Sequence, residues 1–410
     1  MLAALRPSLG VGVDFSANVI AKARAKHPRL NFYEQDGHEL DLGEKFDAVI
    51  LSDLVHDLWD VQKILEGIRK MCQPRTRLIL NFYSFLWEKP FRLAERLKWI
   101  RPKLPQNWLT VEDVANLLYL AEFEVVSRWD EYLWPLPTPV LSKLCNRYLA
   151  RLWPFNLFCL THFVIARPQP QEPQASEEPV VSVIVPARNE AGNIEQIFER
   201  VPEMGAGTEL VFVEGGSKDN TYETIDKAIK AHPQRQSQLL RQTGVGKGDA
   251  VRLGFDRARG EVLMILDADL TVSPEDLPRF YETLRSGKGE FINGVRLVYP
   301  MEKRAMRFIN LLGNKFFSLA FSWLLSQPTK DTLCGTKVLW RSDYELIVDN
   351  RQYFGDFDLL FGAAKLGLKI IDMPVRYGER TYGSTNISRW KHGWLLLRMV
   401  LFAARRIKFV

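Results

Sequence analysis

Two aspartates two positions apart, Asp267 and Asp269, are the residues of this sequence best suited to hold a divalent cation. They follow residues 262–266, a short, wholly apolar run with Gly260 on its other side. Such a run predicts a buried strand of a parallel sheet, and open α/β sheets bind ligands at the carboxyl ends of their strands. Side chains two apart on extended backbone point the same way, so both carboxylates can face one hard cation. A solvated acidic turn is the alternative interpretation of an isolated pair.

The composition is ordinary for a globular protein. The chain has 410 residues, more than one domain commonly holds, with 46% hydrophobic and 25% charged residues and a net charge of +6. Its four cysteines form no CxxC or His-containing metal motif, which favours free thiols in a reducing cytoplasm. The sequence shows neither a signal peptide nor an uninterrupted apolar stretch of membrane-spanning length. We therefore expect a cytosolic protein or one bound to a membrane surface.

A proline-rich segment divides the chain into two parts. Residues 168–179 contain four prolines and no large apolar residue, which is typical of a linker. Residues 1–167 before it and residues 180–410 after it both alternate strand and helix patterns. Two α/β domains are therefore predicted.

Acidic residues follow two predicted strands of the first part, Asp14 at the end of one and Asp36 after the next. The strands are predicted at 11–14, 30–35, 46–51, 77–82, 122–129 and 158–166, and the helices at 16–26, 61–71 and 111–121. This arrangement resembles a class I S-adenosylmethionine-dependent methyltransferase. The resemblance implies that Asp14 holds the ribose of the cofactor and that Asp36 meets its adenine; an ordinary turn cap is the alternative for each.

The first part departs from this family at its beginning. Residues 2–6 look like the end of the family's first helix, stopped by Pro7, with no strand or Gly-rich loop before them. In that fold the first strand lies in the middle of the sheet, so two buried strands would have unpaired backbone groups, each costing on the order of 1–3 kcal/mol. Either the N-terminus of the domain lies upstream of this sequence, which we favour, or the domain cannot bind its cofactor. Both explanations argue against methyl transfer by the chain as it stands.

Aromatic and basic residues alternate between Trp87 and Leu104. The pattern fits a lid or a membrane-facing amphipathic segment. It fits equally an ordinary surface helix whose basic side chains cover apolar surface. No nucleic-acid-binding motif accompanies it, so nucleic acid is not expected as a partner.

Polar turns follow the predicted strands of the second part. They are Val-Pro-Ala-Arg-Asn-Glu at 185–190, the Gly-Gly-Ser-x-Asp turn at 215–219, Gly-Lys-Gly at 246–248, and Asp-Ala-Asp-Leu-x-x-x-Pro-Glu-Asp-Leu at 267–277. Together they resemble family 2 glycosyltransferases of the GT-A fold over essentially residues 180–409. The resemblance implies a second α/β sheet that binds a nucleotide sugar.

The resemblance also implies which residues bind the donor: Pro186, Arg188, Glu190, Glu214, Asp219, Lys247 and Asp267. Asp267 and Asp269 would bind Mg²⁺ or Mn²⁺ that bridges the diphosphate. Where relatives carry two acids before this Gly-Ser turn, the chain has Glu214 and then Gly215, so the sequence leaves the nucleotide open.

The residues expected to bind the sugar acceptor come later in the sequence. Asp358 is the preferred catalytic carboxylate and Asp356 the second choice, with a helix N-cap as the alternative for both. Arg296, Arg307 and Arg380 would position an acceptor phosphate; Arg380 opens a turn, 380–384, similar to the Arg-x-x-Gly-Ser turn of polyprenyl-phosphate sugar synthases. A sugar hydroxyl as acceptor would need Asp358 as general base.

Two apolar and basic stretches, 308–325 and 390–410, favour helices at a membrane interface, with core packing as the alternative. We therefore predict a glycosyltransferase at the inner face of the cell membrane, moving a sugar to polyprenyl phosphate or to a glycan, as in making a cell-envelope glycan. The alternatives are methyl transfer as the main activity with a sugar-binding second domain, and a non-catalytic scaffold on the membrane.

Overall fold

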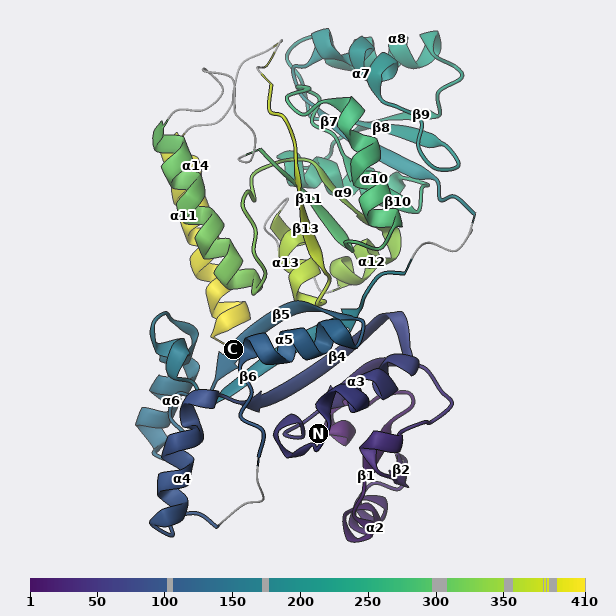
Figure 1. Cartoon of the computed structure of the whole chain (residues 1–410). Coiled ribbons are helices and arrows are strands. Elements are labelled where there is room, and N and C mark those ends of the chain that lie inside the picture. The colour runs from purple at the N-terminus through teal and green to yellow at the C-terminus, as the bar shows by residue number, and fades with distance from the viewer. Residues whose placement is uncertain are drawn as a thin grey trace. The chain divides into compact units, whose positions relative to one another are not determined.

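The computed structural model describes residues 1–101, 106–171, 177–296, 308–349, 357–378, 380, 382 and 389–409. The chain divides into two compact units, Met1–Gln169 and Pro170–Val410 (Figure 1). Each unit has its own sheets and its own buried core.

The second unit contains one seven-stranded sheet in the order β13-β11-β12-β10-β7-β8-β9. All neighbouring strands are parallel except β12, which is antiparallel to β10 and β11. The carboxyl ends of β7, β8 and β10 therefore lie at the same edge, where the sequence places its polar turns. The strands are β7 (Val181–Ala187), β8 (Thr208–Glu214), β9 (Ser237–Arg241), β10 (Val262–Ile265), β11 (Phe291–Val295), β12 (Lys337–Trp340) and β13 (Ile370–Pro374).

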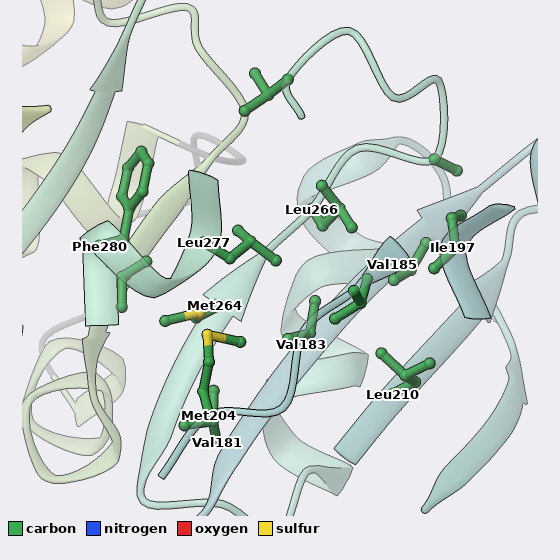
Figure 2. Packing of buried hydrophobic residues seen from close by; sticks show 14 of the residues in the cluster. Val181, Val183, Val185, Ile197, Met204, Leu210, Met264, Leu266, Leu277 and Phe280 are labelled. Atoms are coloured by element: carbon green, nitrogen blue, oxygen red, sulfur yellow. The ribbon is translucent and has the colours of Figure 1, made fainter. Parts of the chain in front are cut away.

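Apolar clusters cover both faces of this sheet. Alternate residues of β7 point to opposite sides, so Val183 joins one cluster and Ile184 the other. Figure 2 shows the first cluster, in which Val183 and Val185 pack near Leu266 and Leu277. It is closed by α7 (Ile194–Arg200), α8 (Thr221–Ala231) and α10 (Leu277–Arg285). The second is closed by α9 (Lys247–Arg257), α11 (Phe308–Leu325), α12 (Arg341–Asp349), α13 (Phe357–Lys365) and α14 (Arg389–Ala403).

Helices α11 and α14 pack against each other and each sends one side into the core. Phe321 of α11 and Val400 of α14 are buried there. Their other sides expose apolar residues, including Leu319 and Trp394. Both helices thus pack in the core and also present apolar surface. In the described part of the chain, no helix has the length and apolar character needed to cross a bilayer.

The strands of the first unit form two separate sheets. β1 (Val11–Asp14) and β2 (Asn31–Glu34) make a parallel pair. The other four strands make a sheet in the order β3-β4-β6-β5. They are β3 (Phe46–Leu51), β4 (Cys72–Tyr83), β5 (Phe123–Glu131) and β6 (Thr161–Pro168). Among the described strands none joins the pair to the four.

The core of the first unit is built on the four-stranded sheet. Leu78, Leu80 and Phe82 of β4 pack with α3 (Val61–Lys70) and α5 (Val111–Leu120), close to the helices predicted at 61–71 and 111–121. By contrast, all four residues of β1 are only partly buried. The remaining helices are α1 (Leu2–Leu5), α2 (Ala17–Lys26), α4 (Glu88–Arg96) and α6 (Pro139–Arg147).

Candidate functional site

The turns after β7 and β8 are hydrogen-bonded to each other at the carboxyl edge of the sheet. Asn189 adopts the left-handed conformation, φ 57°, which Asn tolerates better than most residues. Its N–H donates to Ser217 Oγ (3.0 Å), and its Oδ1 accepts from the N–H of Lys218 (2.7 Å). The N–H of Glu190 donates to Thr221 Oγ1 (3.0 Å). These bonds fix the two loops that the sequence assigns to the donor.

The neighbouring residues predicted to bind the donor lie around these loops. Glu214 ends β8, and its Oε1 accepts from the N–H of Ser217 (2.5 Å). Asp219 Oδ1 accepts from both the N–H and the hydroxyl of Thr221 at the start of α8. Pro186 lies within β7, and Arg188 is exposed just after it. The structure brings them to one edge; their roles toward a nucleotide remain predictions.

Asp267, just beyond β10, forms an ion pair with Lys247 at the start of α9. Burial alone would raise the pKa of Asp267, but Lys247, with Lys337 and Arg296, holds it below its usual range. Gly335 lies directly on this pair: a Cβ there would be 2.0 Å from Asp267 Oδ2 and 2.2 Å from Lys247 Nζ. Glycine is therefore required at this position for the pair to keep its geometry.

Asp269 has a different basic partner. Its Oδ2 accepts from Arg380 (2.5 Å), and its Oδ1 accepts from the N–H (3.2 Å) and hydroxyl (2.8 Å) of Thr271. Arg380 also lies 3.5 Å from Glu190 Oε1. The sequence predicts two carboxylates facing one cation; in the structure each carboxylate is held by its own basic side chain.

Glu190 is a buried acid of this edge with a raised pKa. Its side chain is buried, and its Oε2 accepts from Asn193 (2.9 Å). Burial raises the pKa of Glu190 to about 7, although Arg380 acts in the opposite direction. Perturbed acids of this kind are concentrated at functional sites. The sequence alone gave Glu190 the alternative of an ordinary helix-terminus acid.

Arg296, predicted to hold an acceptor phosphate, forms a bidentate pair with buried Asp331. Its Nε lies 2.7 Å from Oδ2, and another guanidinium nitrogen 3.0 Å from Oδ1. Arg296 lowers the pKa of Asp331, against the opposing effect of burial. The guanidinium carbon also lies 5.1 Å from the centre of the Tyr377 ring. Arg296 thus fixes the turn that follows α11, and any phosphate would meet a guanidinium already oriented by Asp331.

From the sequence, residues 331–337 resemble the family's acceptor-side turn, but no individual role was predicted for Asp331, Lys337 or Tyr382. Lys337 is fully buried in β12 and donates to the carbonyl of Cys334 (2.5 Å). The sequence offered a signal for Lys337, because it begins the apolar run Lys-Val-Leu-Trp. A lysine in a buried strand is rare unless it is paired, so its position predicts a partner nearby. The Tyr382 ring lies against Gly192, where a Cβ would be 2.5 Å from a ring carbon. No sequence signal links these two positions.

Other predicted site residues give less information. Arg307 and Asp356 lie outside the described residues. Asp358 is the second residue of α13, and its side chain is not among those described.

In the first unit, the two residues predicted to bind S-adenosylmethionine act as turn caps. Asp14 Oδ1 accepts from the N–H of Ser16 (2.8 Å). Asp36 Oδ1 accepts from the N–H of His38 (2.9 Å) and contacts its ring Nδ1 (2.8 Å). The hydrogen bonds from His38 lower the pKa of Asp36.

The acid pair has the chemistry of a divalent-cation site. Asp267 and Asp269 offer carboxylate oxygens, the ligands that Mg²⁺ and Mn²⁺ prefer. Within the described ranges, no group of three or more His, Cys, Asp or Glu side chains gathers in a way that would enclose a metal. Two carboxylates fill only part of the coordination sphere of such a cation, so this pair suits a cation with further ligands.

Comparisons with known proteins agree with both resemblances. Residues 182–345 match the family model described as Glycosyl transferase family 2. Residues 2–80 match the model described as Methyltransferase domain. The two families predicted from the motifs are thus confirmed, each for its own part of the chain.

Related proteins match the second unit. Polyprenol monophosphomannose synthase of Mycolicibacterium smegmatis is 28% identical over 235 residues, which are 54% of this chain and 88% of that protein. Dolichol-phosphate mannosyltransferase of Pyrococcus furiosus is 34% identical over 211 residues, 50% of this chain and 59% of that protein. The structure of glucosyl-3-phosphoglycerate synthase from Mycobacterium tuberculosis with Mn²⁺ and UDP superposes with a TM-score of 0.42 at 20% identity, covering 57% of this chain and 81% of that one.

Proposed function

We propose that this chain, whose residues 182–345 are a family 2 glycosyltransferase domain, moves a sugar from a nucleotide-sugar donor to a polyprenyl phosphate, with inversion at the anomeric carbon. One observation carries the proposal. At the carboxyl edge of the sheet, Asp267 and Asp269 meet the cationic side chains of Lys247 and Arg380 beside buried Glu190. One site therefore contains carboxylates that could bind a metal ion and basic side chains that could bind a diphosphate.

On the donor side, the loops after β7 and β8 would hold the base and ribose, because their hydrogen bonds fix Asn189, Glu190 and Asp219 at the same edge. Lys247 and Arg380 each pair with an aspartate of the acid pair and would reach the diphosphate from there. Asp267 and Asp269 would hold Mg²⁺ or Mn²⁺, which supplies charge neutralisation on the leaving diphosphate.

On the acceptor side, a phosphate is already ionised and needs positioning rather than a general base. Arg296 would supply that contact, since Asp331 holds its guanidinium in a fixed orientation. Arg307 and Arg380 are the other candidates. The names of the polyprenol and dolichol-phosphate relatives support a lipid-phosphate acceptor for this chain.

The same proposal places the second unit at the inner face of the membrane. Helices α11 and α14 contain no acidic residue, and they expose Phe316, Leu319, Trp394 and Leu401. Arg398 is exposed on the same side of α14 as Trp394 and Leu401, at helical spacings of four and three. Apolar and basic residues on one helix face suit the surface of an anionic bilayer.

The decisive experiment is transfer from labelled nucleotide sugars to undecaprenyl phosphate, with Mn²⁺ or Mg²⁺ and with a chelator. We expect metal-dependent labelling of the lipid by the wild type and a loss of about 10²–10³-fold in Asp269→Ala, since removing one group that stabilises transition-state charge typically costs this much. Glu261→Ala, which removes an exposed acid just before the same strand, is the matched control. Failure to bind any nucleotide sugar would refute the proposal.

A second substitution separates the two acceptor classes. In Asp358→Asn, transfer to polyprenyl phosphate should continue, because an ionised phosphate needs no base. A hydroxyl acceptor would instead lose about 10²–10⁴-fold, the usual contribution of a general base. A large loss with intact donor binding would move the acceptor to a glycan hydroxyl.

The methyltransferase match in residues 2–80 supports a second, separate proposal: that the first unit binds S-adenosylmethionine through Asp14 and Asp36. Calorimetric titration of the whole chain with S-adenosylmethionine tests it. Binding that weakens in Asp14→Ala and Asp36→Ala would support it. No detectable binding by the wild type would remove the cofactor from this chain.

A further inference from the structure

The first unit has an apolar surface that its core does not use. It is formed by Leu93, Leu97 and Trp99 in and after α4, and by Val140, Leu144 and Trp153 in and after α6. All six are exposed, with Val140 at 81%, Trp153 at 79% and Trp99 at 77%. We call this set the α4–α6 surface. It is distinct from α11 and α14, which belong to the other unit.

The two segments that form the α4–α6 surface are joined by the fold. The indole N–H of Trp87, at the start of α4, donates to the carbonyl of Phe158, at the end of the α6 segment (3.0 Å). The N–H of Ser84 donates to the carbonyl of Leu160 (2.7 Å). Figure 1 shows α4 and α6 on the same side of the first unit. The two hydrogen bonds therefore hold the start of α4 next to the end of the α6 segment.

The α6 segment of this surface carries charge of one sign, whereas α4 contains Glu88 and Glu95 beside its basic residues. Residues 132–158 contain no Asp or Glu, and they carry Lys143, Arg147 and Arg151. Along α6, Val140 and Leu144 are four residues apart and so lie on one stripe. Lys143 and Arg147, also exposed and four apart, form the adjoining stripe. Basic side chains beside an apolar stripe can extend to lipid phosphates while their stems lie on the apolar layer.

Exposed aromatic residues add to this pattern. Trp99 and Trp153 come from separate segments, and tryptophan is favoured where one side of a ring is apolar and the other meets water. Contiguous apolar patches of this kind on a folded unit mark an interaction site. Their combination with cationic residues and the absence of acids from 132–158 favours an anionic layer over a protein of mixed charge.

We infer that the α4–α6 surface docks the first unit on a bilayer of anionic lipid. This contact is independent of sugar transfer and of the helices α11 and α14. It would give the first unit a membrane contact of its own, in addition to the one proposed for the second unit.

Vesicle co-sedimentation of the full chain tests the inference, with vesicles of phosphatidylglycerol and of phosphatidylcholine. In Val140→Glu/Leu144→Glu we expect binding to phosphatidylglycerol vesicles to weaken about tenfold or more, because acids replace apolar contacts at an anionic surface. Trp59→Glu is the control, since Trp59 is 95% exposed but lies outside the surface. Lys143→Gln/Arg147→Gln, which keeps the apolar stripe, should reduce the preference for phosphatidylglycerol.

Two further readouts keep the test decisive. The circular dichroism spectrum should not change in any variant, and sugar transfer to a short-chain polyprenyl phosphate in detergent should match the wild type. Failure of sugar transfer in the wild type would count against the proposed function and leave vesicle binding as a separate result. The inference is overturned if the double glutamate variant binds vesicles as Trp59→Glu does. It is equally overturned if the wild type ignores vesicles and forms a dimer that this variant dissociates.

Discussion

The sheet of the second unit is hydrogen-bonded from edge to edge through seven strands, whereas the six strands of the first unit form one sheet of two and one of four. In the second unit, β10, β7 and β8 are direct neighbours, so the turns that follow them meet at one edge. In the first unit, Asp14 and Asp36 follow the separate pair β1 and β2, and no described pairing connects these strands to β3.

This difference matters because a ligand site at a sheet edge depends on strand neighbours. Hydrogen bonds between adjacent strands hold them in register and so keep the residues at their ends close together. Asp267 and Asp269 of the second unit follow a strand held in this way, and they pair with Lys247 and Arg380. The candidate cofactor residues of the first unit are fixed only by their own turns.

The largest expected effect tests the core of the continuous sheet. Phe212 is fully buried in β8 and stacks on Phe198 with ring centres 5.1 Å apart. Phe212→Ala should lower the free energy of unfolding of the second unit by about 3–5 kcal/mol, because it leaves a cavity. Urea unfolding followed by circular dichroism measures it. Phe15→Ala in the first unit, at 81% exposure, should change stability by less than about 0.5 kcal/mol.

The next effect tests the buried ion pair of the site. Asp331 is 1% exposed, so Asp331→Ala leaves the Arg296 guanidinium buried without its carboxylate. We expect a loss of about 3 kcal/mol in the free energy of unfolding. The surface pair Asp276–Arg279 supplies the comparison, and Asp276→Ala should cost no more than about 1 kcal/mol. Equal costs would mean that Asp331 does not fix the turn.

A pH-dependent effect follows from Glu190. Its pKa is raised from 4.5 to about 7, so between these pH values the folded protein binds more protons than the unfolded chain. The free energy of unfolding of the metal-free protein should therefore fall by about 1–3 kcal/mol as the pH rises from 4.5 to 7. Thermal unfolding across this range should show that decline in the wild type and lose it in Glu190→Gln. Glu199→Gln, an exposed acid of α7, should behave as the wild type.

The smallest expected change in stability comes from making the same substitution, Val to Ala, in one strand of each unit. Val183 in β7 is fully buried, whereas Val13 in β1 is partly exposed. Val183→Ala should cost about 2 kcal/mol and Val13→Ala less than about 1 kcal/mol. Hydrogen exchange should agree, with faster exchange of the β1 amides than of the β7 amides, because exchange follows local opening. Equal protection of the two strands would show that the break in the sheet does not weaken the first unit.

The sequence by itself determined the two α/β units, the strands that precede Asp14, Glu190 and Asp267, and the families of both parts. These features are local: an apolar run, a turn residue and a helix cap act over a few neighbouring positions. In the first unit the predicted strands at 11–14 and 46–51 match β1 and β3.

Only the tertiary structure decided which side chains meet. The pairing of Asp269 with Arg380 joins residues 111 positions apart, and the pairing of Asp331 with Arg296 joins residues 35 positions apart. The burial of Lys337 beside Asp267 and the packing of Tyr382 on Gly192 likewise depend on the order of strands in the sheet. That order follows from the packing of both faces over the whole unit, and no local pattern encodes it. The sequence therefore predicted the candidate site residues, and the fold assigned their partners.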